Sequence, residues 1–137
     1  MKFLGIDYGA RRIGVAVSNA EGTIAFPRLT VENQRGALDT IKKLAVEEKV
    51  ETVVMGDTRS YGGTENPITK QAEAFGVALS DALGVPLVKA FEVATSVEAA
   101  RFAPKGKEHD DAAAAAVILQ RYFDMKGRSG DHSPKYE

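Results

Sequence analysis

The stretch from Lys2 to Asn19 constrains the fold of this 137-residue chain more than any other. Two apolar runs, Phe3 to Ile6 and Ile13 to Val17, flank a short polar turn that contains Gly9. Two strand-like runs around a Gly-containing turn predict a β-hairpin. Asp7 interrupts the end of the first run, where a buried carboxylate is costly unless a positive charge pairs with it. Asp7 is therefore either a functional residue or an acid that binds turn amides, as Asp often does.

The rest of the chain predicts three more strands and four helices. In chain order these are a strand at Thr23 to Val31, a helix capped by Asn33 and ending near Lys49, a strand at Glu51 to Gly56, a helix from about Ile68 to Leu83, a strand at Val85 to Phe91, a short helix from Thr95 or Ser96 to Arg101, and a helix from about Asp110 to Met125. Pro27 suggests that the third strand lies at an edge.

The order of these elements predicts an α/β fold. Three strands joined by short turns form an antiparallel meander, and the two later strands each follow a helix, so they should run parallel to the first strand. The result is a five-stranded mixed sheet in the order 3-2-1-4-5 with helices on both faces. This arrangement resembles the ribonuclease-H-like fold.

Composition narrows the possible classes of protein. We expect one domain at residues 1–125, followed by a disordered tail at 126–137 that is rich in Gly, Ser, Lys and Pro. The absence of cysteine excludes a thiolate metal site and fits a reducing, cytoplasmic location. No apolar run has the length of a membrane span, so no membrane partner is expected. Eighteen basic and nineteen acidic residues give a net charge of −1, which leaves only a local patch for nucleic acid.

Acidic residues mark the carboxyl ends of the three strands predicted to be parallel. Asp7 ends the first strand, Asp57 follows the fourth and Glu92 follows the fifth. In sheets of this kind, sites lie at the carboxyl ends of the parallel strands. The topology therefore predicts that these three acids converge, although no local spacing along the chain reveals it.

The last predicted helix adds two further acids, Asp110 and Asp111. Acids in a first turn also suit the helix dipole, which is the ordinary reading. The five alanines at Ala112 to Ala116, however, would let the helix approach the sheet closely and bring one of these acids to Asp7. Carboxylates that meet in this way repel one another unless they bind cations, and oxygen ligands suit Mg²⁺ or Mn²⁺. Two such ions can activate water and stabilise both oxygens in phosphodiester hydrolysis.

Four segments, in order along nearly the whole domain, make a specific resemblance. They are LGIDYGARRIGVAVS at Leu4 to Ser18, MGDTRSYGGTE at Met55 to Glu65, FEVATS at Phe91 to Ser96 and DAAAAAVILQRYF at Asp111 to Phe123. They resemble the YqgF/RuvX family of Holliday junction resolvase-like proteins, now commonly described as pre-16S rRNA nucleases. The resemblance implies a divalent-metal nuclease that acts on structured RNA or branched DNA. Its usual assignment is maturation of the 5′ end of pre-16S rRNA, with the small ribosomal subunit precursor as partner.

The resemblance also assigns the catalytic and metal-binding residues. The family's first Asp corresponds to Asp7 and its Glu to Glu92. Its late Asp corresponds to Asp111 rather than Asp110, because it stands ten positions from Gln120 when both are counted.

Several positions depart from the family pattern. Phe91 and Val93 flank Glu92 where the family usually has Asp and Arg, and Asn19 stands where an Asp is usual. Asp57 begins a segment where the family has Leu-Pro. We hypothesise that Asp57 is a supplementary metal ligand; the alternative is a loop Asp that caps local amides.

Basic residues near the predicted site would contact the substrate. Arg11 and Arg12 lie in the turn beside Asp7, and Lys105 and Lys107 precede the last helix. An exposed basic turn is the ordinary reading, but beside a phosphodiester site these side chains predict phosphate contacts.

Two other functions remain open at this point. A non-catalytic RNA-binding ribosome-assembly factor could use the same fold, and the altered segment around Glu92 favours it somewhat. A sugar-kinase or actin-like ATPase also begins with an Asp-x-Gly turn between strands, but needs two such domains. The sequence leaves monomer and homodimer undecided.

Overall fold

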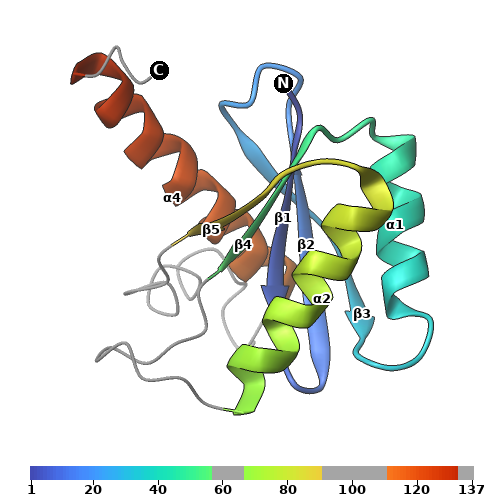
Figure 1. The fold of residues 1–137 in the computed structure, drawn as a ribbon. Helices are drawn as coiled ribbons and strands as arrows, with labels where there is room; N and C mark the ends of the chain where they lie inside the picture. Colours follow the sequence, from blue (N-terminus) through green and yellow to red (C-terminus); the bar gives the residue numbers. More distant parts are fainter. Residues whose placement is uncertain (57–66, 91–110, 133–137) are drawn as a thin grey trace.

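The structure is a computed structural model that describes residues 1–56, 67–90 and 111–132. The described residues form a five-stranded sheet in the order β3-β2-β1-β4-β5, with three helices (Figure 1). The strands are β1 (Phe3–Tyr8), β2 (Arg12–Ser18), β3 (Ala25–Glu32), β4 (Thr52–Gly56) and β5 (Leu87–Ala90), and the helices are α1 (Ala37–Glu47), α2 (Pro67–Leu83) and α4 (Asp111–His132). None of these helices is long and apolar enough to cross a membrane.

The pairing of β1 confirms the predicted topology. β1 is antiparallel to β2 and parallel to β4, and β4 is parallel to β5. β3 is an edge strand, as Pro27 suggested, and a register shift between Val15 and Ala16 interrupts its pairing with β2. The carboxyl ends of β1, β4 and β5 therefore share one edge of the sheet.

Helices cover both faces of the sheet. Figure 1 shows α1 and α2 over one face and α4 over the other. The side chains of β1 alternate between these two layers: Leu4 and Ile6 belong to the core formed with α1 and α2, and Phe3 to the core formed with α4. Because successive side chains of a strand point to opposite faces, Gly5 and Asp7 continue the Phe3 row on the α4 face.

Helix α4 approaches the sheet closely. A Cβ atom added at Gly5 would lie 3.0 Å from the Cβ of Leu119 and 3.1 Å from the carbonyl oxygen of Ala115. The alanines at 112–116 are all buried. Small residues on both surfaces are thus the reason that this helix packs against the strands at short range.

Gln120 fixes α4 to the edge of the sheet. Its Oε1 accepts a hydrogen bond from the backbone N–H of Ala25 at 3.0 Å, and its Nε2 donates to the carbonyl oxygen of Thr23 at 3.0 Å. Ala25 is the first residue of β3 and Thr23 lies in the turn just before it, so one side chain sets the position of the helix along the sheet.

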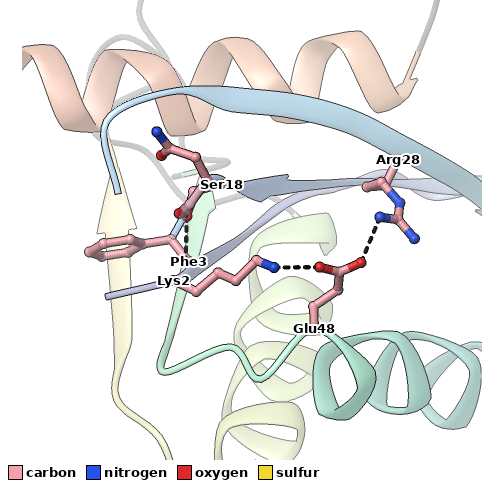
Figure 2. A network of polar contacts seen from close by, with 6 residues as sticks. Lys2, Phe3, Ser18, Arg28 and Glu48 are labelled. Atoms are coloured by element: carbon pink, nitrogen blue, oxygen red, sulfur yellow. Dashed lines mark hydrogen bonds and ion pairs between the residues drawn. The ribbon is translucent and has the colours of Figure 1, made fainter. Parts of the chain in front are cut away.

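The amino end of β1 is tied to its neighbours by the polar contacts in Figure 2. The Glu48 carboxylate accepts hydrogen bonds from Nζ of Lys2 and Nη1 of Arg28, each at 2.6 Å. The bond from Lys2 is the main reason that the pKa of Glu48 lies below its usual value of 4.5; the bond from Arg28 acts in the same direction, and burial opposes both. In addition, the N–H of Phe3 donates to the hydroxyl oxygen of Ser18 at 2.8 Å.

The prediction that Asn33 caps the first helix is wrong. α1 begins at Ala37 after Gly36, which has a φ of 96° and makes no side-chain cap. Asn33 instead donates from Nδ2 to the carbonyl oxygen of Gly9, and its N–H donates to that of Arg11, both at 2.8 Å. An Asn side chain binds backbone groups of either a helix or a turn, and here the first hairpin provides the partner.

Other boundaries differ less. β5 begins at Leu87, two residues later than predicted, and its predicted last residue, Phe91, lies outside the described residues; α4 continues to His132, beyond the predicted end at Met125. Figure 1 shows this last part of α4 projecting past the sheet. The short helix predicted from Thr95 or Ser96 to Arg101 lies outside the described residues. The division into a domain at 1–125 and a tail at 126–137 stays a prediction.

Candidate active site

Asp7 lies at the carboxyl end of β1 and is half-buried. Its direct cross-strand partner in β2 is Gly14. Directly opposed residues point to the same face of a sheet, so the position of a Cβ at Gly14 indicates what Asp7 faces. That face is the one covered by α4.

Gly14 brings the start of α4 to Asp7. A Cβ added at Gly14 would lie only 1.8 Å from the carbonyl oxygen of Asp111 and 2.2 Å from its carbonyl carbon. The peptide of Asp111 therefore occupies the space that a side chain at position 14 would need. Since Asp7 and Gly14 are partners, the first residue of α4 lies beside Asp7 at the same edge of the sheet.

Asp111 forms an ion pair with Arg12. Nε of Arg12 donates to Oδ2 of Asp111 at 2.8 Å, with side-chain exposures of 44% for Arg12 and 10% for Asp111. The hydrogen bond to Asp111 is the main reason that the pKa of Arg12 lies above its usual value, and the negative charge of Asp111 adds to it. A carboxylate in the first turn of a helix also interacts favourably with the helix dipole.

The remaining predicted acids lie outside the described residues. These are Asp57, which follows the last residue of β4, and Glu92, which stands two positions after the last residue of β5; Lys105 and Lys107 also lie outside. Within residues 1–56, 67–90 and 111–132, no group of three His, Cys, Asp or Glu side chains is placed to hold a metal ion. The structure thus brings two of the predicted ligands, Asp7 and Asp111, to one edge.

Arg11 lies at the same edge in an exposed position. The turn that carries it is closed by a bond from the N–H of Gly9 to the carbonyl oxygen of Arg12 at 3.0 Å, and it is fixed to the β3–α1 loop through Asn33. Arg11 and Arg12 therefore lie at the edge where they were predicted, beside Asp7, and their contact with phosphates stays a prediction. The link between Arg12 and Asp111 was not predicted, because the two residues are 99 positions apart.

Asn19, one departure from the family pattern, has a structural role far from Asp7. Its Oδ1 accepts bonds from the N–H groups of Thr23 and Ile24 at 2.8 and 3.0 Å, which closes the β2–β3 turn. This turn lies at the opposite end of β2 from Arg12. The departure therefore leaves the site itself unchanged.

The donor chemistry of the site fits a hard divalent cation. Asp7 and Asp111 both present carboxylate oxygens on the α4 face, and Mg²⁺ and Mn²⁺ prefer such ligands. Two neighbouring carboxylates also repel each other, and a shared cation relieves that repulsion.

The fold resembles that of two solved proteins. Thermus thermophilus RuvC aligns with a TM-score of 0.62 at 18% identity, over 95% of this chain and 97% of RuvC. The fowlpox virus Holliday junction resolvase aligns with a TM-score of 0.59 at 10% identity, over 91% of this chain and 99% of the resolvase. These likenesses, with the strand order, define a domain of the ribonuclease-H-like class.

Sequence similarity then defines the family. A family model described as "RuvX: Holliday junction resolvase" matches residues 1–125. A protein of Paraburkholderia xenovorans is 36% identical over 134 residues, covering 94% of this chain and 90% of its own length. A protein of Oenococcus oeni is 33% identical over 140 residues, covering 93% and 97%. Both relatives are named "Putative pre-16S rRNA nuclease". The chain belongs to the RuvX (YqgF) family, a family of nucleases.

Proposed function

We propose that this protein is a divalent-metal-dependent nuclease that hydrolyses phosphodiester bonds in structured RNA. One observation carries the proposal: Gly14 seats the first residue of α4 beside Asp7, so that two acids far apart in the sequence meet at the carboxyl end of β1. Acids that a fold gathers at the carboxyl ends of parallel strands are candidates for a functional site.

In this proposal Asp7, Glu92 and Asp111 hold Mg²⁺ or Mn²⁺, and Asp57 is a supplementary ligand. The bound metal supplies an activated water and stabilises the charge that develops on the phosphate and leaving oxygens. The carboxylates fix the position of the reaction, and the half-buried setting of Asp7 limits the access of other water. Arg11, Arg12, Lys105 and Lys107 contact phosphates of the substrate, which positions it without reading its sequence.

The substrate that we propose is the 5′ region of pre-16S rRNA in the cytoplasm, on the precursor of the small ribosomal subunit. The names of the relatives at 33% and 36% identity support this choice. Branched DNA is the second candidate, because the matching family model carries the description of a Holliday junction resolvase.

A cleavage assay with Asp7→Asn tests the proposal. Precursor rRNA fragments and four-way DNA junctions are incubated with Mg²⁺, Mn²⁺ or a chelator. We expect metal-dependent RNA cleavage that falls on the order of 100-fold in the variant, because the change keeps the shape but removes a ligand charge. The melting temperature without metal should stay equal or rise, since repulsion is relieved.

Asp39→Asn is the matched control, because Asp39 is an exposed acid in the first turn of α1. It should cleave like the wild type. Undiminished cleavage by Asp7→Asn would overturn the site. Cleavage of the junction alone would favour the resolvase, and RNA binding without any cleavage would favour a non-catalytic assembly factor.

A further inference from the structure

The ion pair between Arg12 and Asp111 places a positive charge on a proposed metal ligand. Nε of Arg12 lies 2.8 Å from Oδ2 of Asp111, a distance typical of a charge-assisted hydrogen bond. The guanidinium therefore satisfies part of the charge that a cation would otherwise balance. This observation is independent of the resemblance to any relative.

A divalent cation and the guanidinium compete for the same carboxyl group. If both bound Asp111 together, two positive groups would sit on the oxygens of one carboxylate and repel each other. Metal ligation would also withdraw electron density from that carboxylate and weaken it as a hydrogen-bond acceptor for Arg12.

We propose that Arg12 is an internal placeholder cation on Asp111, which divalent metal displaces, and that the displaced guanidinium then binds a phosphate of the substrate. This inference rests on the proposed function, because it needs Asp111 to be a metal ligand. It deepens that function by making the phosphate contact of Arg12 conditional on metal loading.

The packing shows which of the two partners moves. Asp111 is 10% exposed and belongs to a helix whose first peptide is seated on Gly14. The Arg12 side chain is 44% exposed and extends from the first residue of β2. Arg12 is thus the partner with room to rotate, and a guanidinium matches a phosphate with two parallel hydrogen bonds.

A rival role predicts the opposite result. If Arg12 instead held Asp111 in place for the metal, as outer partners of metal ligands often do, removing Arg12 would weaken metal binding. If Arg12 is a competitor, removing it strengthens metal binding. The sign of the change therefore separates the two roles.

Mn²⁺ binding to the full chain without nucleic acid measures that sign. Free Mn²⁺ is followed by electron paramagnetic resonance during titration of the wild type, Arg12→Ala and Arg11→Ala. We expect Arg12→Ala to lower the Kd about fivefold, and Arg11→Ala, which removes the neighbouring exposed charge, to change it less than about twofold. An unchanged or raised Kd for Arg12→Ala overturns the inference. If Arg12→Ala unfolds, Arg12→Gln is read in the same way.

A second measurement needs no change at Arg12. In the wild type the ¹⁵N–¹H resonance of the Arg12 Nε group should move on addition of Mg²⁺, toward its position in Asp111→Asn, where the charged acceptor is absent. A resonance that stays in place while Mn²⁺ binds overturns the inference and leaves the proposed nuclease intact. Absence of any Mn²⁺ binding by the wild type overturns both.

Discussion

The two ends of β1 carry opposite arrangements of charge. At the amino end, the Glu48 carboxylate lies between Lys2 and Arg28 (Figure 2). At the carboxyl end, Asp111 lies beside Asp7, and Arg12, the first residue of β2, binds Asp111. The first end has two cations bound to one acid, whereas the second gathers two acids and the two arginines Arg11 and Arg12.

This difference separates a structural site from a functional one. Partly buried carboxylates stabilise a fold when their charge is compensated and destabilise it when it is not. Charged groups gathered at the carboxyl ends of parallel strands are the usual position of a functional site, so this end of β1 is the end at which chemistry is expected. Changes at the two ends should consequently affect different properties.

The largest expected effect is that of Gly14→Ala, which would break the acidic end. The added methyl group collides with the carbonyl of Asp111, so α4 must shift and Asp111 must leave Asp7. Overpacking of this kind costs about 1–3 kcal/mol of unfolding free energy, and cleavage should fall to near background. Thermal unfolding and the RNA cleavage assay measure the two effects.

Gly5→Ala is the matched control on the same strand and helix. Its Cβ would lie 3.0 Å from the Cβ of Leu119 and 3.1 Å from the carbonyl oxygen of Ala115, contacts much less severe than the 1.8 Å at Gly14 and away from the acids. It should lower stability but retain much more cleavage than Gly14→Ala. Equal loss of cleavage in both variants would show that helix packing in general, rather than the seat of Asp111, controls activity.

A smaller effect is expected for Glu48→Gln, which removes the compensated acid. Unfolding free energy at pH 7 should fall by about 1 kcal/mol, since partly exposed ion pairs contribute little, while cleavage stays unchanged. The pKa of Glu48 is lowered by folding, so its contribution is fully present above its usual value of 4.5 and is lost as pH falls through the lower folded pKa. Chemical denaturation at pH 7 and at pH 3 tests this.

The stabilities of wild type and Glu48→Gln should therefore converge at low pH. A gap that is the same at both values would mean that the carboxylate charge is not what stabilises the amino end. A loss of cleavage would mean that the two ends are coupled.

The smallest effect is expected for Asn19→Asp, which introduces the residue usual in the family. The carboxylate can still accept the bonds from Thr23 and Ile24, and only the bond from Nδ2 to the Thr23 hydroxyl is lost. Stability should change by less than about 0.5 kcal/mol and cleavage should not change. A marked gain in cleavage would give this turn a role in substrate binding that its distance from Asp7 does not suggest.

The sequence predicted the parts of the fold that depend on periodicity and order. The hairpin around Gly9, the parallel β4 and β5 and the buried stripe of α1 all follow from apolar patterns along the chain. The run of alanines before Gln120 also predicted correctly that the last helix packs closely on the sheet.

The contacts that build the site follow from no local pattern. Arg12 and Asp111 are 99 positions apart, so their pairing depends on how α4 is seated on β2. The same is true of Gly14, which looks like any other strand glycine until the helix is placed. Asn33 was assigned to the wrong element because its side chain suits a helix start and a turn equally well.

The bond between Gln120 and the start of β3 has a consequence for how this chain can vary in length. Gln120 and Asp111 both belong to α4, and contacts with the sheet hold each of them in place. They lie about 13 Å apart along the helix axis at 1.5 Å per residue. Losing a single residue between them would turn Asp111 about 100° around the helix axis if Gln120 stays bonded. Substitutions along that span can be absorbed by repacking, but a deletion or insertion cannot, so we expect the spacing between these two residues to be among the least variable lengths in the protein.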